Sequence, residues 1–485
     1  MVAKKSLYIF YLGFIVFATT LYSDTYHNIQ GFYGERAAGL GGAFTAVSDD
    51  PSGAFYNPAG LAFAYDNSIS LSASNYKNTT KSYSNVLGAG QSYEKKSNNY
   101  TPNFFGIVRS VSPKLKMGFS IVNPINDTFN RNDQINLPLY YPDITNMKNY
   151  NIESYSQIQA GFSAAYSFTD RLSLGASLYA TSDTASITQT SLVQAKDKSY
   201  SAQTFVDNRR TLGMYPVVGF MFAPSDLISI GVSLRKQFVT AGNRLVNAIS
   251  TASGNTTSDI VFTEATHRRG AVSLGNTVGI VPSQTGYIPE TTELRGGIAL
   301  FPTKRLMIAG DLIYTSGYKR LSNQNYLTRF TDNTIQYTLN DKEIQELTRY
   351  STLNFAGGVE YFASDNIVFR LGGFTNNANS KENSWLRSAL EAQNRIIGSY
   401  ENVLTSGNVN VRYLIPAFRS NVRNEYVNTI GYTFGFSWST AKASLGITFI
   451  KEYGKGSSQL DDTRPSQQLI YNSTAFYVVV SSRTN

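Results

Sequence analysis

The chain has 485 residues, of which 42% are hydrophobic, 13% aromatic and only 15% charged, and its formal net charge is +9. The lack of cysteine excludes a lipid-anchored lipoprotein and a disulfide-stapled secreted domain. Downstream of the N-terminal region there is no apolar run of about 18 residues, which excludes helical membrane spans.

The N-terminus has the pattern of a secretory signal peptide. Lys4 and Lys5 precede an apolar run over residues 7–18, and a small residue, Ser23, marks the predicted cleavage site at the end of residues 1–23. A single membrane anchor is the alternative, but the run is shorter than the roughly 20 residues that a spanning helix needs. We therefore expect an exported chain with no nucleic-acid partner, whose basic residues face acidic lipid or polysaccharide or are simply solvated.

Residues 24–67 come next and are rich in small residues and chain breakers. Gly39, Gly41 and Gly42 are expected to let the backbone pack closely against a wall. Asp49 and Asp50 precede a proline, which is typical of a short helix start, and they are candidate caps or partners of a wall.

The stretch "GAFYNPAGLAFA" that follows carries no charge. Proline at position 58 forces an extended or turn conformation on Asn57, whose side chain is expected to hydrogen-bond nearby backbone. Asn57, Pro58, Ala59 and Gly60 form the central motif of the segment.

The remainder of the chain shows period-2 alternation in hairpins with short turns. In "IQAGFSAAYSFTDRLSLGASLYA", Phe162, Tyr166 and Phe168 share one face with lipid-facing character, and the other face is small or polar. Further hairpins turn near residues 112–114, 224–226, 302–304, 364–365 and 439–441. With single strands at Ser68–Tyr76 and Ser473–Val480, the predicted total is fourteen.

Long polar links alternate with these short turns. Seven links are expected, over residues 77–103, 123–156, 182–212, 240–291, 317–351, 376–427 and 453–472. Outer-membrane barrels place long loops outside and short turns in the periplasm, whereas a β-sandwich predicts no such alternation. The predicted fold is therefore all-β, a fourteen-stranded antiparallel transmembrane barrel over residues 68–482, in the outer membrane of a diderm bacterium.

Fourteen strands enclose a lumen that side chains alone do not fill. The run Ala38–Ala43, Ser48-Asp49-Asp50 and the Asn57-Pro58-Ala59-Gly60-Leu61 motif resemble the N-terminal plug of the FadL-like family of outer-membrane long-chain fatty-acid transporters. The motif likeness covers about 35 residues, and the strand count extends it over the mature chain as architecture.

The resemblance implies passive uptake of hydrophobic molecules, with residues 24–67 as a plug that gates a lateral opening in the wall. The implied partners are a fatty acid or another hydrophobic ligand and outer-membrane lipid, with the protein as a monomer and no cofactor or metal. A barrel of this kind without transport, acting as a surface anchor or secretion partner, is the alternative.

Charged residues at or beside lumen-facing positions leave two interpretations open. Arg109 and Arg370 either meet a ligand carboxylate or join a cross-barrel ion-pair network with residues such as Asp311 and Glu360. The resemblance also implies an irregularity in the third strand. Pro124 lies at its expected end, where it either ends the strand or marks a wall opening.

Enzyme chemistry is not indicated. The two histidines are His27, before the barrel, and His267, in an expected loop. Neither lies on a predicted strand beside a nucleophile, and the sequence has no G-x-S-x-G, P-loop or Cys/His metal cluster.

Overall fold

The structure is a computed structural model that describes residues 26–86, 92–100, 102–135, 144–196, 200–253, 262–268, 288–332, 336–382, 400–406, 409–415, 419–420, 425–458 and 466–484. The predicted signal peptide, residues 1–23, lies outside this described part of the chain.

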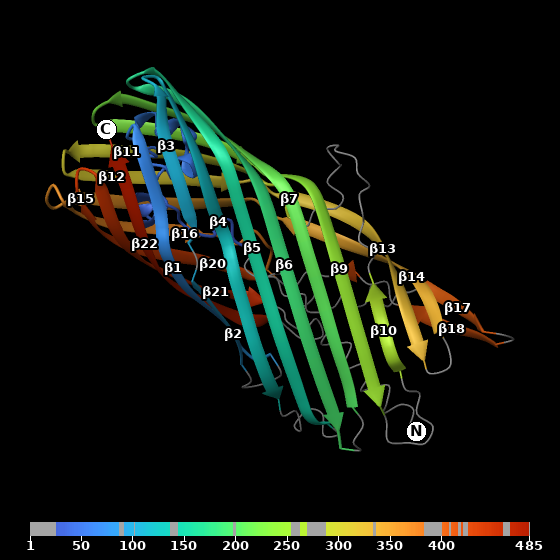
Figure 1. Ribbon diagram of the computed structural model, residues 1–485. Helices are drawn as coiled ribbons and strands as arrows, with labels where there is room; N and C mark the ends of the chain where they lie inside the picture. Colours follow the sequence, from blue (N-terminus) through green and yellow to red (C-terminus); the bar gives the residue numbers. More distant parts are fainter. Residues whose placement is uncertain are drawn as a thin grey trace.

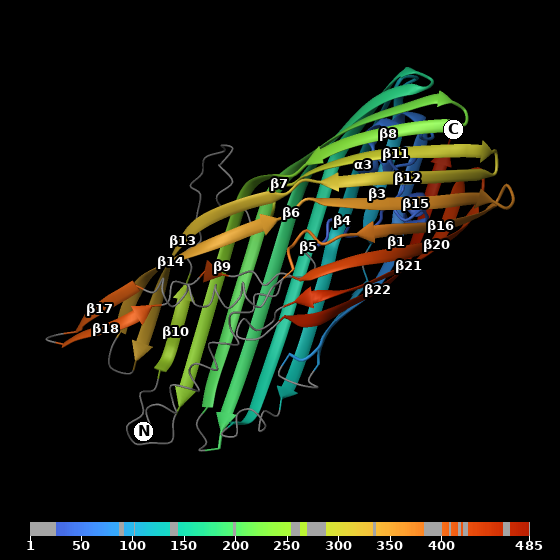
Figure 2. The same ribbon diagram turned by 180° about the vertical axis from the view of Figure 1, so that it is seen from behind.

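A closed antiparallel barrel of fourteen strands dominates the molecule (Figures 1 and 2). Two of these strands are interrupted, so that β2 and β3 form one strand and β8 and β9 another. The barrel closes because β1 pairs with the last strand, β22, on one side and with β3 on the other. The barrel segments are β1 (Asn67–Tyr83), β2 (Tyr93–Tyr100), β3 (Phe104–Ser112), β4 (Leu115–Ile135), β5 (Ile144–Thr169), β6 (Leu172–Ala195), β7 (Tyr200–Ser225), β8 (Ile228–Lys236), β9 (Phe238–Ser253), β11 (Thr292–Thr303), β12 (Leu306–Thr315), β15 (Thr352–Phe362), β16 (Ile367–Asn376), β20 (Tyr426–Ser439), β21 (Ala443–Ser458) and β22 (Gln467–Thr484).

Further strands lie beyond the barrel wall. β13 (Tyr318–Asp332) and β14 (Gln336–Arg349) form a hairpin that continues from β12 and β15 (Figure 2). They join β10 (Phe262–Arg268) and β19 (Arg419–Ser420) in one small sheet, and β17 (Tyr400–Ser406) pairs with β18 (Val409–Ile415). His267 therefore lies on a strand, β10, and the expectation that it lies in a loop is wrong.

All six predicted hairpin turns and both terminal strands are confirmed by the strand bounds. The expected lengths of the links are wrong, because strands run through much of them. For example, β5 and β6 pair continuously from residues 144 and 195 down to their turn. Outside the membrane both faces of a strand meet water, so the backbone ladder continues where the apolar alternation stops.

The alternation of side chains separates a lipid face from a lumen face. Large apolar side chains such as Phe162 (68% exposed), Leu371 (60%) and Ile430 (71%) point outward, whereas the buried positions between them include small, polar, charged and some apolar residues. Residues 26–66, here called the N-terminal segment, pack against these inward positions inside the barrel (Figure 2). The segment contains α2 (Glu35–Gly39), α3 (Gly53–Tyr56) and the 3-10 helix η1 (Pro58–Phe63).

Candidate functional site

The N-terminal segment is held to the barrel wall by side chains that donate to its carbonyl oxygens. The hydroxyl of Ser177 donates to Ala54 O at 2.8 Å, and that of Thr433 to Gly39 O at 2.8 Å. Further donations run from Ser173 to Ala59 O, from Ser229 to Ala46 O and from Arg235 Nη2 to Tyr56 O. These strands lie around much of the barrel, so the segment is fixed to the wall on several sides.

Asn57 connects the two halves of the segment to each other and to the wall. It is fully buried and extended (φ −151°, ψ 100°), as predicted from the proline that follows it. Its Nδ2 donates to Thr45 O at 2.8 Å and to Phe220 O of β7 at 3.0 Å, and its Oδ1 accepts from Ala59 N at 3.2 Å. The local bonds were predictable from sequence, whereas the bond to β7 was not.

The glycines allow the close approach to the wall that the sequence predicts. Gly41 has φ +65°, and a Cβ there would stand 2.9 Å from Gly373 N of β16. Gly42 has φ +88° and lies against the ring of Phe32, and Gly39 lies against the side chain of Arg370. Side chains at positions 39 and 41 would therefore push the segment away from the wall, and one at position 42 would meet Phe32 of the segment itself.

Asp50 caps the turn before α3, and Asp49 does not contact the wall directly. Asp50 Oδ1 accepts from the backbone N of Ser52 at 2.7 Å and from its hydroxyl at 2.6 Å. Burial raises the pKa of Asp50 to about 6, although the bond from Ser52 acts in the opposite direction. Asp49 instead pairs with Arg36 of the same segment.

A chain of ion pairs joins the segment to β15 and β16. Arg36 pairs with Glu360 at 2.8 Å, Glu360 with Arg370 at 2.6 Å, and Arg370 with Glu35 at 3.0 Å. Glu360 is fully buried and Arg370 is 4% exposed. Arg370 thus belongs to an ion-pair network, which is one of the two interpretations that the sequence left open. It has a carboxylate of the protein on each side. Asp311 makes a separate attachment, accepting from the backbone N of Phe44 and of Thr45 at 3.0 Å each.

Arg109 does not share this site, and its expected position at the lumen is wrong. It is exposed and pairs across the ladder with Met117, which is 46% exposed on the outer face. The buried residues of β3 are Phe104, Gly106 and Val108, on the opposite face. The strand lies near a short turn, where a cation on the outer face reaches the water interface.

The wall is irregular where β4 passes Pro124. The ladder between β3 and β4 runs from Ser112 opposite Leu115 to Phe104 opposite Val122. Beyond it, the described residues of β2 and β4 pair at one position, where Ser97 lies opposite Phe129. The register between β4 and β5 also shifts between Val122 and Ile125. β4 nevertheless continues to Ile135, so the interpretation of Pro124 as a strand end is wrong.

Amide side chains bridge this interruption of the ladder. Asn99 of β2 and Asn126 of β4 hydrogen-bond to each other's strand, with Asn99 Nδ2 donating to Asn126 O. The backbone O of Asn103 accepts from the backbone N of Asn123, and its side-chain Nδ2 donates to Phe32 O of the N-terminal segment at 2.9 Å. The interruption therefore adjoins the segment inside the barrel.

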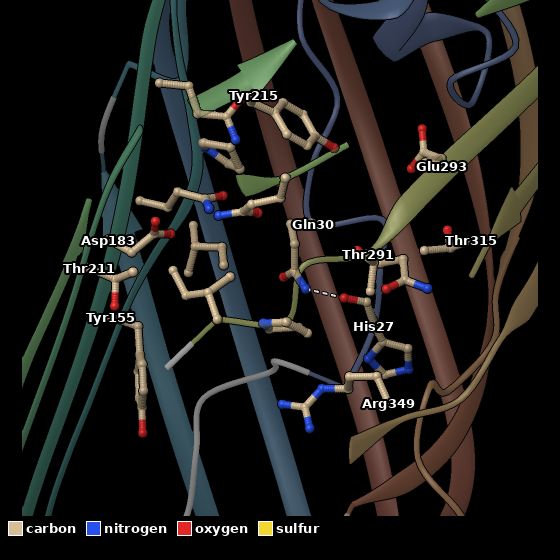
Figure 3. A pocket seen from close by; sticks show the side chains of 18 of the residues that line it. His27, Gln30, Tyr155, Asp183, Thr211, Tyr215, Thr291, Glu293, Thr315 and Arg349 are labelled. Atoms are coloured by element: carbon tan, nitrogen blue, oxygen red, sulfur yellow. Dashed lines mark hydrogen bonds between the residues drawn. The ribbon is translucent and has the colours of Figure 1, made fainter. Parts of the chain in front are cut away.

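A cavity of about 220 Å³ lies between the start of the N-terminal segment and the wall. Figure 3 shows His27 and Gln30 of the segment between Asp183 and Thr211 on one side and Glu293 and Thr315 on the other. Pro124 and Ile125 are part of the lining, so the cavity reaches the interrupted ladder. The apolar part of the lining includes Ile29, Tyr33, Phe55, Tyr155, Tyr215, Ile288 and Leu347.

The charged part of the lining is mainly cationic. Five arginines and two carboxylates line the cavity, a surplus of three positive charges: Arg209, Arg235, Arg295, Arg320 and Arg349 against Asp183 and Glu293. This surplus of positive charge makes this end of the lumen attractive to anions.

Two of these arginines share one carboxylate. Arg235 Nε lies 3.2 Å from Glu293, and Arg295 pairs with the same Oε1. The guanidinium of Arg235 lies over the Phe55 ring at 4.5 Å, and that of Arg295 over the Tyr56 ring at 5.5 Å. The segment and the cationic wall therefore contact each other at the cavity.

Sequence reasoning missed Arg235, Arg295 and Glu293. A usable signal existed, because each is a charged residue at an inward position beside an outward leucine, Leu234 in "GVSLRK" and Leu294 in "TELRGG". Their convergence on one cavity depends on the register between β8 and β11, where Glu293 lies opposite Arg235.

The described residues also bear on metal binding and on membrane helices. No group of three or more His, Cys, Asp or Glu side chains in that part of the chain is placed to hold a metal ion. No helix there is long and apolar enough to cross a membrane. His27 contacts the wall, with Nε2 at 2.6 Å from Val427 O.

Several solved structures share this architecture along nearly their whole length. The toluene transporter TodX of P. putida aligns with a TM-score of 0.57 at 13% identity, covering 94% of this chain and 100% of TodX. The Ralstonia pickettii toluene transporter TbuX gives 0.52 at 14% identity, with 94% and 100% covered. A Pseudomonas aeruginosa FadL homologue gives 0.52 at 13% identity, with 93% and 98% covered.

No protein-family model matches the sequence, and no curated protein matches it. The closed barrel with its apolar outer face defines a β-barrel protein of the outer membrane of a diderm bacterium. The structural likenesses identify its fold as FadL-like, as the sequence predicted.

Proposed function

We propose that this protein is an outer-membrane channel for the passive uptake of hydrophobic compounds, with long-chain fatty acids as the ligand class. The single observation that carries the proposal is the cavity, which is lined by the N-terminal segment, by apolar rings and by the interrupted stretch of wall at Pro124. A ligand resting there touches both the element that would gate it and the place where it would leave.

The exit is proposed to lie between β2 and β4, beside residues 123–128. In a barrel wall, backbone groups are normally satisfied by a continuous ladder, and separating two strands there costs many hydrogen bonds at once. At this place side chains such as Asn99 and Asn126 replace the ladder, so fewer bonds must break. The N-terminal segment would act as the gate, because Asn103 at the interruption bonds to Phe32.

Charge favours a fatty acid over a neutral hydrocarbon. The descriptions of TodX and TbuX name toluene, which has no charge to satisfy. Here two arginines compete for Glu293 beside the apolar rings of Phe55 and Tyr56. A carboxylate would neutralise the second guanidinium, and a buried charge pair with hydrogen bonds is far less costly than an unpaired buried charge.

Uptake by cells lacking their own fatty-acid channel tests the proposal. Labelled palmitate and labelled toluene are supplied separately to cells that express the protein, the variant lacking residues 24–67, Asn57→Ala, or an empty vector. We expect palmitate uptake above the vector control, changed by both variants, with toluene uptake lower than palmitate uptake. Palmitate uptake equal to the vector control overturns the proposal and leaves the anchor or secretion role.

The role of the arginines is tested with Arg295→Gln, which keeps a hydrogen-bond donor beside Glu293. We expect about tenfold weaker palmitate uptake, equivalent to roughly 1.4 kcal/mol, and unchanged uptake of uncharged long-chain alcohol. The control is Arg171→Gln, because Arg171 is exposed at a turn and pairs with Asp226 outside the lumen. Equal losses for the acid and the alcohol would contradict the carboxylate assignment.

A further inference from the structure

A continuous row of aromatic side chains crosses the outer face of five neighbouring strands. The register places Phe434, Phe449, Phe476, Tyr76 and Tyr100 opposite one another in turn, from β20 through β21, β22 and β1 to β2. Neighbouring rings lie close, with centroids 5.1 Å apart for Phe449 and Phe476 and 4.8 Å apart for Tyr76 and Tyr100. Aromatic rows of this kind lie at the level of lipid headgroups in membrane barrels.

The next row of outward positions holds a fixed cation. Lys451 pairs with Thr474 across the ladder, and Thr474 pairs with Asn78. Lys451 Nζ donates to Asn472 Oδ1 at 2.6 Å and to Thr474 Oγ1 at 2.8 Å. Asn78 in turn donates to Asn98 of β2. The ammonium group is thus positioned by neutral side chains, with one of its three N–H donors left over.

Apolar and aromatic side chains surround this cation. Lys451 lies opposite Tyr432, which is 58% exposed, and the outward position above it on β21 is Tyr453, which is 44% exposed. Phe449 lies below it on the same strand. A half-buried ammonium among rings carries more electrostatic weight than one in open water.

Two carboxylates on the strands that carry these rows are committed elsewhere. Glu452, the neighbour of Lys451 in sequence, faces inward and accepts from Asn376 and Thr429. Glu94 lies on β2 opposite Ser82 and pairs with Lys96 at 2.8 Å. Among the residues described in these two outward rows, the positive charge of Lys451 has only neutral partners.

We propose that Lys451, with Asn472 and Thr474, is a binding site for the phosphate of a lipid headgroup in the surrounding outer leaflet. The site combines a positioned ammonium, neighbouring hydroxyl and amide groups, and an aromatic row below it for the acyl chains of the lipid. Phosphate supplies the opposite charge that the protein does not provide there, and the bilayer supplies it at the level of the aromatic row. This site is on the outside of the barrel and is independent of the cavity and of transport.

Lipid retention by the purified protein tests the site. Diphosphorylated lipid A and its dephosphorylated form are titrated separately into the full-length protein in detergent, and bound lipid is counted by native mass spectrometry. We expect the phosphorylated lipid to bind at least about tenfold more tightly. The variant Lys451→Gln, which still donates to Asn472 and Thr474 but has no charge, should lose that difference, and Lys451→Arg should keep it within about threefold.

Two controls make the result specific. Lys148→Gln removes an exposed lysine of β5, on another part of the wall, and should bind lipid as the parent does. Each variant is used only if it shows the heat-dependent gel shift of a folded barrel. Unchanged binding by Lys451→Gln, equal binding of the two lipids, or full competition by millimolar inorganic phosphate would each overturn the lipid site.

Discussion

At the scale of single residues, Asn57 attaches the N-terminal segment to the wall, which its position in a short motif does not indicate. Its amide joins Thr45 of the segment to Phe220 of the wall, and it accepts from Ala59. Because Asn57 and its bonds to Thr45 and Ala59 are buried, the loss of the amide would leave Thr45 O without its side-chain donor and Ala59 N without its acceptor. The motif therefore attaches the segment to β7.

We predict that Asn57→Ala frees the segment around α3. Removing the three bonds should cost about 2 kcal/mol or more, which raises the labelling rate of a cysteine introduced at buried Ala54 at least about thirtyfold. The chain has no native cysteine, so the reporter is unambiguous. Asn28→Ala is the matched control, because Asn28 bonds to Thr352 and not to this part of the segment. Equal labelling of both variants would contradict the assignment.

Asp50 should make the stability of the segment depend on pH. Its pKa is raised to about 6 from 3.8, so the folded state binds more protons than the unfolded state between these values, and stability falls as pH rises through them. At pH 7 Asp50→Asn should be more stable by about 1–2 kcal/mol, less than the full shift because the side chain is partly exposed. Below pH 3.8 the two proteins should unfold alike. Thermal unfolding followed by circular dichroism at both pH values measures this, and a stabilisation that persists at low pH would contradict it.

At the scale of elements, glycines in the strands form the seat of the N-terminal segment. A Cβ on Gly219 of β7 would stand 2.0 Å from Asn57 Oδ1, and one on Gly175 of β6 would stand 2.4 Å from Ala59 N. By contrast, a Cβ on Gly296 of β11 would meet nothing within 4 Å. Close contact with the segment thus requires glycine at positions 175 and 219 but not at position 296.

We predict that Gly219→Ala displaces η1 and that Gly296→Ala does not. The overlap should cost about 1–3 kcal/mol, as overpacking does elsewhere, and should raise labelling of a cysteine at Ala54 by about tenfold or more. Gly296→Ala should label as the parent does and form the barrel equally well. Equal labelling of the cysteine at position 54 in both glycine variants would show that the segment does not rest on β7 at Gly219.

The sequence predicts elements well where one face meets lipid and poorly elsewhere. All six short turns were predictable because apolar alternation resumes on both sides of each, as at Thr169–Leu172. The parts of the strands that extend beyond the membrane were not predictable, because both of their faces are polar. Pairing between distant strands is also invisible in one sequence, so Arg235 and Glu293 could not be brought together. Arg109 shows the limit of reading charge as lumen-facing, since it lies outside near a turn.

At the scale of the whole molecule, the N-terminal segment is attached unevenly. Toward β15 and β16 it is held by the ion pairs of Arg36, Glu360 and Arg370, and breaking such buried pairs is costly. Beside the interrupted ladder of β2 and β4, the described bond to the segment is the one from Asn103 to Phe32, whereas nearer the turn of β4 Lys116 donates to Ala64 O and pairs with Asp66. At the interruption a neutral hydrogen bond therefore attaches the segment, where the wall itself has lost part of its ladder.

A reversible crosslink across the interruption tests whether a ligand leaves there. We predict that Asn99→Cys combined with Asn126→Cys, two positions that contact each other across β2 and β4, loses palmitate uptake by about tenfold on oxidation and regains it on reduction. The control pair is Ala164→Cys with Ala176→Cys, which face each other on the continuous ladder of β5 and β6 and should transport equally in both redox states. Because both pairs close a disulfide between neighbouring strands, a general stiffening of the barrel would affect them alike. Undiminished uptake by the oxidised Asn99/Asn126 pair would place the exit elsewhere, whereas loss in that pair alone assigns it to the amide-bridged gap.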